Sequence, residues 1–296
     1  VRLEFCSGFA AGGIAMNDRS TRLARAAALP LLLLAFATAL AQEGGAPTTR
    51  LLVTETRIKP DKIADWLALE RNEVVPALKK AGVKQYTVFQ TMIGDTNDFV
   101  VVRPLPTFSE FDGPSPLERA LGADKATALI AKLRACEDWV HRSIENRHDD
   151  LYLDPGHAQA LFVSRYRAMP GKARDYMSFV HTEMYPVMVK AKANGTFAGL
   201  EVTTSVQGGE PGIITLNMYY ADFAPLDGPP PIAKTLGPQG TAEFLTKGAG
   251  LISQLEQRIL KRVPELSFWV TRAARQGRVE DGVDGRLNGV YSLRLR

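Results

Sequence analysis

The sequence has few residues suited to nucleophilic, redox or metal chemistry. It contains two cysteines and four histidines among 296 residues. Because Cys6 lies in a segment expected to be removed, only Cys136 would remain, which excludes a disulfide within the mature monomer. The motifs G-x-S-x-G, G-x-x-x-x-G-K-[ST], H-E-x-x-H and C-x-x-C are all absent. No motif therefore names a reaction, and the sequence leaves open whether the protein is an enzyme.

The composition is that of a soluble globular protein, with 45% hydrophobic and 23% charged residues and a mean hydropathy of −0.09. It excludes a disordered chain, a collagen-like chain and a polytopic membrane protein. Residues 1–41 hold four basic and two acidic residues, and residues 272–296 hold six and three, which leaves 26 basic and 27 acidic residues in 42–271. The folded body is nearly neutral, so we expect no nucleic-acid partner.

The N-terminal region has the pattern of an export signal. Three arginines between residues 16 and 25 precede an apolar run over 26–40, and Ala39-Leu40-Ala41 fits a cleavage site before Gln42. We interpret 1–15 as a gene-start overcall and 16–41 as a signal peptide. The mature protein is then expected to be periplasmic or extracellular, with no transmembrane segment after cleavage. The Arg-, Gly- and Asp-rich tail, residues 272–296, is expected to be disordered.

The mature chain is an internal duplication. At an offset of 110 residues, Arg57 matches Arg167 and Glu73 matches Glu183. After a five-residue insertion at 208–212 the offset becomes 115, and the Asp-Gly-Pro sequence at 112–114 recurs at 227–229. These ordered matches predict two equivalent halves, at about 49–155 and 158–271.

Each half is expected to follow the order βαββαβ. Strand-like segments at 50–58 and 160–168 each precede a helix that starts near Pro60 or Pro170. Hairpins follow at 85–93 with 98–104, and at 196–206 with 213–221. Second helices are predicted through Leu129–Ile144 and Phe244–Ile259, and short final strands at 151–153 and 266–270. This is the ferredoxin-like order. Its open sheet face needs a cover, so the predicted fold is α+β, with two halves packed sheet to sheet as one intramolecular α/β barrel.

This arrangement resembles the dimeric α/β-barrel superfamily. The x-Pro-x-Lys helix starts and the Glu-x-x-Pro segments give a looser resemblance to NIPSNAP-type domains. The resemblance implies a cavity between the two sheets. Duplicated members of the chlorite-dismutase type bind haem through a histidine in the second half, which would make His181 the ligand. Their extended motif is not recognisable here, so no cofactor is predicted and haem is retained only as a minor alternative.

Positions that differ between the halves are candidates for ligand contact, because a single site needs each residue only once. They would form an asymmetric cavity with aromatic walls for a small apolar or aromatic molecule. The ligand-binding candidates are His181, Tyr185, Tyr219, Trp66 and Glu70. Residues kept in both halves are instead expected to form structural Arg–Glu pairs: Arg57 with Glu73, and Arg167 with Glu183.

Other reactive residues are assigned to structure. Cys136 is expected to be a buried thiol, and His141 and His148 to lie around an exposed helix end, so no metal site is predicted. Two function classes remain open. The first is an exported small-molecule-binding protein without assignable catalysis. The second is a small oxidoreductase, either cofactor-free and monooxygenase-like or haem-dependent. Self-association is compatible with both.

Overall fold

The computed structural model describes residues 47–269. The gene-start segment at 1–15, the signal peptide at 16–41 and the tail at 272–296 therefore lie outside the described residues. None of the helices within 47–269 combines the length and apolar character needed to cross a membrane.

The first half comprises four strands and the helices between them. Its elements are β1 (Thr48–Ile58), η1 (Pro60–Lys62), α2 (Ile63–Leu69), the π-helical turn η2 (Glu70–Val74), α3 (Val75–Lys80), β2 (Gln85–Ile93), β3 (Asp98–Pro104), η3 (Phe108–Phe111), α4 (Pro116–Leu121), α5 (Ala123–Cys136), β4 (Glu137–His148) and η4 (Asp149–Leu151).

The second half repeats this order. Its elements are β5 (Ala160–Ala168), α6 (Ala173–Phe179), the π-helical turn η5 (Val180–Met184), α7 (Tyr185–Ala193), β6 (Gly199–Gln207), β7 (Ile213–Tyr220), η6 (Ala224–Asp227), α8 (Pro231–Gly248), β8 (Ile252–Arg262), η7 (Pro264–Leu266) and β9 (Phe268–Trp269).

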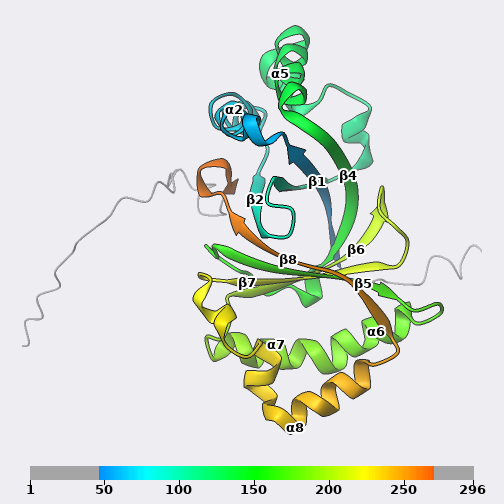
Figure 1. Cartoon of the computed structure of the whole chain (residues 1–296). Coiled ribbons are helices and arrows are strands. Elements are labelled where there is room, and N and C mark those ends of the chain that lie inside the picture. Colours follow the sequence, from blue (N-terminus) through cyan, green and yellow to red (C-terminus); the bar gives the residue numbers. More distant parts are fainter. Residues whose placement is uncertain (1–46, 270–296) are drawn as a thin grey trace, which may run out of the picture. The chain divides into compact units, whose positions relative to one another are not determined.

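The strands close into an eight-stranded antiparallel barrel. The order within the halves is β4-β1-β3-β2 and β8-β5-β7-β6. The halves join where β4 pairs with β6 and where β2 pairs with β8. Helices α2 and α5 cover the outer face of the first half-sheet, whereas α6, α7 and α8 cover the second on the opposite side (Figure 1). The predicted barrel of two ferredoxin-like halves is confirmed.

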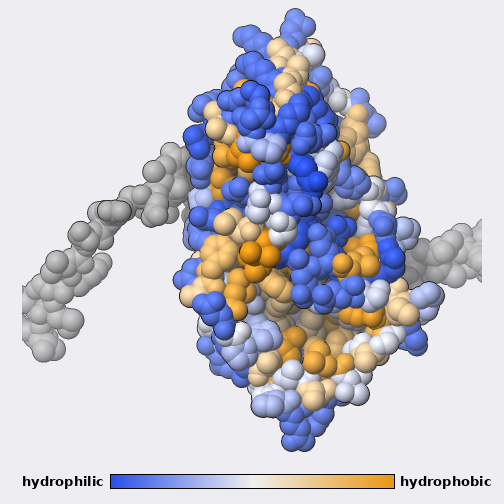
Figure 2. Space-filling model, in the orientation of Figure 1, coloured by the Kyte–Doolittle hydropathy of each residue, from blue (hydrophilic) through white to orange (hydrophobic). Residues whose placement is uncertain are grey.

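The core has three parts because each half-sheet has two faces. One apolar cluster around Trp66 and Phe99 lies between the first half-sheet and its helices. A second, around Tyr176 and Met188, lies under the helices of the second half. A third fills part of the barrel and includes Leu161 and residues from both halves. On the face shown in Figure 2, apolar residues form separate patches on a largely hydrophilic surface.

A π-helical turn interrupts the first long helix of each half at the same place. Pro76 and Pro186 follow these turns at the start of α3 and α7. Proline has no N–H to donate to the carbonyl one turn earlier, so the helix widens there instead of continuing in regular α geometry. Glu70, the first residue of η2, is buried in the layer under the helices.

The predicted extent of the second helices is wrong. α5 ends at Cys136 and the next residues form β4, while 252–262 form β8. The apolar residues that suggested continuing helices are Cys136, Val140 and Ile144, and Leu251, Leu255 and Ile259, each four positions apart. A spacing of four fits one helical turn and also the two-residue period of a strand. The expected final strands are accordingly reduced to an isolated bridge at Leu153 and to β9.

Candidate functional site

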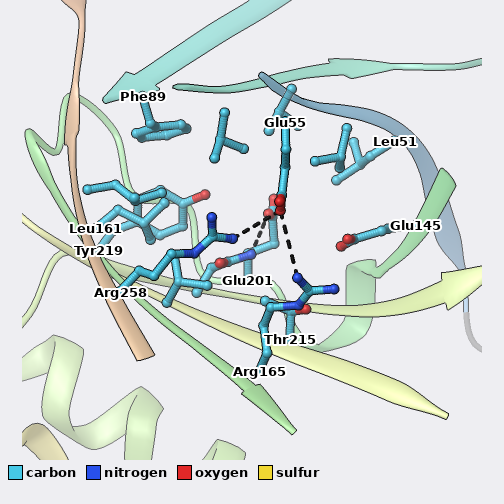
Figure 3. Close-up of a pocket in the computed structure, with 16 residues that line it drawn as sticks. Leu51, Glu55, Phe89, Glu145, Leu161, Arg165, Glu201, Thr215, Tyr219 and Arg258 are labelled. Carbon is cyan, nitrogen blue, oxygen red and sulfur yellow. Dashed lines mark hydrogen bonds and ion pairs between the residues drawn. The ribbon is translucent and has the colours of Figure 1, made fainter. Parts of the chain in front are cut away.

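The barrel interior is lined by alternate residues of the strands and is nearly filled. Its open space is a cavity of only about 50 Å³, enough for a few water molecules. Apolar side chains such as Phe89 and Leu161 lie to one side of it, and charged side chains occupy the centre (Figure 3). The cavity that the resemblance implies between the two sheets is therefore present but small.

Charged groups in the barrel satisfy one another. Arg258 donates to Glu55 over 3.0 Å, and a guanidinium nitrogen of Arg165 lies 3.8 Å from the same carboxylate (Figure 3). Glu201 accepts a hydrogen bond from the side-chain amide of Asn217 at 3.2 Å. Burial raises the pKa of Glu201 to about 7. The pairs of Glu55 with Arg258 and Arg165 join strands of the two halves, whereas the Glu201–Asn217 pair lies within the second half.

A larger cavity of about 410 Å³ lies on the other face of the first half-sheet, between the strands and the helices. We call it the helix-face cavity. Its deep end is formed by the buried residues Trp66, Glu70, Leu78 and Tyr86. Its outer end reaches the surface, since the lining residue Phe111 is 56% exposed. The volume falls in the range of small-molecule sites.

Glu70 and Tyr86 form a buried polar pair at the deep end of the helix-face cavity. The Tyr86 hydroxyl donates to Oε2 of Glu70 over 3.0 Å, and the two side chains are about 6% and 5% exposed. Burial raises the pKa of Glu70 to about 7, the Tyr86 hydrogen bond opposes the rise, and the charge of Glu137 adds to it. A carboxyl with a pKa near neutrality can exchange a proton with a bound molecule.

Three arginines surround the outer part of the helix-face cavity. Arg103 pairs with Glu110 at 3.0 Å, and Arg134 pairs with Glu137 at 3.2 Å. Arg142 also lines the cavity, from β4. The Trp66 indole nitrogen is buried without a hydrogen bond of normal geometry. Burial raises the pKa of the nearby Glu137 carboxyl. The Trp66 N–H is close enough to this carboxyl to oppose the rise in part. The walls therefore combine apolar and ionic groups.

The corresponding layer of the second half is packed with aromatic rings. Phe179 contacts Tyr176 and Phe244 at centroid distances of 6.1 and 4.9 Å. The backbone of Gly248 is so close to Phe179 that a Cβ at this glycine would lie 3.2 Å from the ring. In the chain alignment Gly248 stands opposite Leu133, so the glycine admits the phenyl ring. The difference between the halves makes the helix-face cavity an asymmetric feature, as a single binding site requires.

The structure brings some of the sequence candidates together and separates others. Trp66 and Glu70 both line the helix-face cavity, whereas Tyr219 points into the barrel beside Glu201 (Figure 3). Tyr185 packs against the core of the second half. His181 lies 38% exposed on η5 with Nδ1 3.5 Å from Asp150, and it lines neither cavity. This position of His181 does not fit a haem ligand in either cavity.

The expected Arg–Glu pairs have other partners. Arg57 pairs with Asp95 and, at 2.7 Å, with Asp98. Glu73 pairs with Lys132 at 3.0 Å. The second half repeats the pattern, with Arg167 on Glu210 and Glu183 on Lys247. The correction has a geometric reason: the arginines end the first strands beside the hairpin turns, whereas the glutamates face the second helices. Cys136 is a buried free thiol.

Three residues of the helix-face cavity were missed at the level of sequence: Tyr86, Arg103 and Arg142. They lie on β2, β3 and β4, and all face the helices. These residues could have been found from the two-residue alternation of side chains along a strand, which places Arg103 on the same face as Val101. For Arg142 this signal was hidden because its segment was assigned to a helix. Within 47–269, no group of three His, Cys, Asp or Glu side chains is arranged to hold a metal ion.

The architecture defines a class: a barrel made of two ferredoxin-like repeats with helices outside. No protein family model and no curated protein matches the sequence. Several solved structures match the fold. A proposed monooxygenase from Lactobacillus acidophilus NCFM matches with a TM-score of 0.51 and 9% identity, over 73% of this chain and 94% of that one. An anthrone oxidase-like protein matches with a TM-score of 0.50 and 11% identity, over 73% and 91%.

A NIPSNAP family protein from Agrobacterium tumefaciens str. C58 aligns with 32% of this chain and 90% of its own, at 16% identity and a TM-score of 0.29. At these identities the likeness concerns the fold alone. The chain has the fold of the dimeric α/β-barrel superfamily, with an eight-stranded barrel built from two halves of one polypeptide.

Proposed function

We propose that this protein binds a small apolar or aromatic molecule in the helix-face cavity, and that Glu70 holds a polar group of that molecule. The observation that carries the proposal is a buried carboxyl with a pKa of about 7 at the end of a cavity of about 410 Å³. Burying an acidic group costs free energy that a packed apolar side chain would not. The second half shows the packed alternative, because Val180 occupies the position that corresponds to Glu70.

The lining of the cavity indicates how such a molecule would be oriented. Trp66, Val74 and Leu78 offer apolar contacts at the deep end. The Tyr86 hydroxyl already donates to Glu70, which leaves the second carboxyl oxygen for a ligand hydroxyl. Below the pKa of Glu70 this oxygen can donate a hydrogen bond, and above it the carboxylate can only accept one. Binding of a hydroxyl-bearing aromatic compound should therefore depend on pH around neutrality.

Calorimetric titration with 2-naphthol between pH 5.5 and 8.5 tests this proposal. The wild type should bind with an affinity that changes around pH 7, and Glu70→Gln should bind with a flat pH profile. Glu201→Gln is the matched control, since Glu201 is another buried glutamate with a pKa of about 7 but lines the barrel cavity. Absence of binding to the wild type, or loss of binding in Glu201→Gln alone, would contradict the proposal.

A second candidate function is that of a cofactor-free oxidoreductase acting on an electron-rich phenol. A carboxylate with a pKa near neutrality can take the proton of a phenolic hydroxyl, and a phenolate loses electrons to dioxygen more readily than a phenol does. The solved structures of a proposed monooxygenase and an anthrone oxidase-like protein support this direction at the level of fold. Oxygen consumption with anthrone, whose enol tautomer anthranol is a phenol, would support it if the wild type shows it and Glu70→Gln does not. Equal rates in both proteins would reject it.

We also propose that the protein acts outside the cytoplasm. The proposal rests on the charged, apolar and small-residue segments of residues 16–41. N-terminal sequencing of the natively produced protein should give Gln42 or a neighbouring residue. Recovery of a cytosolic protein that still starts at Met16 would contradict it.

A further inference from the structure

Among residues 47–269, Arg142 is the cation at the mouth of the helix-face cavity that has no partner. The other two arginines of the cavity wall are paired, Arg103 with Glu110 and Arg134 with Glu137. Arg142, by contrast, makes no ion pair and no side-chain hydrogen bond within the part of the chain that the structure describes. A guanidinium presents several donors in a planar fork that matches a carboxylate.

The surroundings of Arg142 favour an incoming anion. Arg142 is exposed, but partial desolvation lowers its pKa, and the nearby guanidiniums of Arg134 and Arg103 lower that pKa further. The negative charge of Glu137 opposes them but is already engaged by Arg134. Glu110, Glu118 and Glu137 also line the cavity, and two of the three arginines are already paired, so the charge that remains open to an anion is that of Arg142 itself. A negative group bound at the mouth would pair with that guanidinium and offset its repulsion with Arg134 and Arg103.

The second half of the chain is an internal control for the role of these charges. Thr54 lies opposite Arg142 in the β1–β4 ladder, and the equivalent rung of the β5–β8 ladder joins Ser164 to Gln257. In the β1–β3 ladder, Leu52 lies opposite Arg103. The equivalent pair in the β5–β7 ladder is Phe162 and Met218. The second half forms the same strands with neutral residues at both places, so the fold does not require the positive charges of the first half.

We infer that the ligand of the helix-face cavity is an organic acid: an aromatic or apolar body enclosed by the deep walls, with a carboxylate or similar anionic group bound by Arg142. This inference rests on the proposed function, because it names the class of molecule held by that site. The exposed apolar residues Phe111 and Ile130 line the same mouth, so the body of the ligand can extend between them while its anionic group reaches the guanidinium.

A matched pair of probes, 1-naphthoate and the neutral 1-naphthamide, tests the inference by calorimetry. The wild type should bind the naphthoate at least 10-fold more tightly, because a hydrogen bond to a charged group contributes about 1.5–3 kcal/mol, roughly 10- to 150-fold. Added salt should weaken the binding of naphthoate and leave the binding of naphthamide unchanged. Arg142→Gln, which installs the residue found at 257, should remove the preference and retain naphthamide binding.

Arg71→Gln is the control, since Arg71 is an exposed arginine of η2 that pairs with Glu265 outside the cavity. It should bind both probes as the wild type does. Equal wild-type affinity for the two probes, or an unchanged preference in Arg142→Gln, would overturn the inference while leaving the proposed function in place. If neither probe binds the wild type while 2-naphthol does, the inference fails and the proposed function stands; if 2-naphthol does not bind either, both fail.

Discussion

The hydroxyl of Tyr86 donates a hydrogen bond to Oε2 of Glu70 across the boundary between the sheet and the helices. Tyr86 belongs to β2 and Glu70 to the π-helical turn η2. The contact therefore connects the two layers at the deep end of the helix-face cavity. Because burial raises the pKa of Glu70 to about 7, the same contact is sensitive to protons in the physiological range.

Glu70→Gln should change the dependence of stability on pH. The pKa of Glu70 is about 7 in the folded protein and 4.5 in the reference state. Between these values the folded protein holds a proton that the unfolded chain releases, so wild-type stability falls as the pH rises from about 4.5 to 7 and then levels off. Glutamine is neutral throughout. The variant should gain about 3 kcal/mol relative to the wild type over this window.

Urea unfolding at pH 4.5, 5.5, 7 and 8 measures this difference directly. The free energy of unfolding of Glu70→Gln minus that of the wild type should grow with pH and then stay constant. A difference that is the same at all four pH values would show that Glu70 does not hold a proton in the folded state at neutral pH.

Tyr86→Phe should raise the pKa of Glu70 further. The phenolic hydrogen bond lowers that pKa because it stabilises the charged carboxylate. Without this hydrogen bond the neutral form of Glu70 is favoured, and the midpoint of its ionisation moves to a higher pH. Side-chain 13C NMR of labelled glutamate can follow this midpoint, with Glu70→Gln identifying the signal. A midpoint that moves downward would contradict the assigned role of Tyr86.

The ion pair inside the barrel should show strong coupling between its partners. Arg258 is 8% exposed and donates to Glu55 over 3.0 Å. Arg258→Met leaves the carboxylate of Glu55 with only the more distant Arg165, so we expect a loss of about 2–4 kcal/mol, below the ~3–5 kcal/mol of a fully buried pair because Glu55 is partly exposed. The double variant Glu55→Gln/Arg258→Met should lose less than the sum of the single losses. Strict additivity in chemical denaturation would reject the coupling.

Arg57 and Arg167 should differ although they are equivalent in the duplication. Arg57 pairs with the buried Asp98, whereas Arg167 pairs with Glu210, which is 66% exposed. Arg57→Met leaves a buried carboxylate without its partner, and Arg167→Met leaves an exposed one in water. Thermal unfolding should therefore show a clear decrease in Tm for Arg57→Met and little change for Arg167→Met. Equal decreases would favour the symmetric structural role expected from the sequence.

The sequence predicts the barrel well because the duplication supplies the same signals twice. The hairpin strands 85–93 and 98–104 coincide with β2 and β3, since Gly94 and its polar neighbours interrupt two β-rich runs. The ends of the second helices could not be predicted in the same way. Apolar residues at intervals of four satisfy both helix and strand, and only pairing with β1 or β5 decides between them.

The site was predictable in part, from the positions that diverged after duplication. Trp66 and Glu70 were found by this comparison, and both line the helix-face cavity. His181 and Tyr185 diverged as well, yet they lie in the second half, where aromatic rings fill the layer under the helices. Divergence identifies positions that differ between the halves, but it does not show which half contains an open cavity. That depends on how completely side chains fill each layer, as the phenyl ring of Phe179 does beside Gly248.

Crystals soaked with 4-bromophenol show whether the helix-face cavity binds a phenol, because anomalous scattering from bromine locates the ligand without assumptions about its orientation. We expect a bromine peak in the helix-face cavity and a phenol oxygen within hydrogen-bond distance of Glu70. A peak inside the barrel beside Glu201 and Tyr219, or no peak in either cavity at a concentration that gives binding heat in solution, would contradict it.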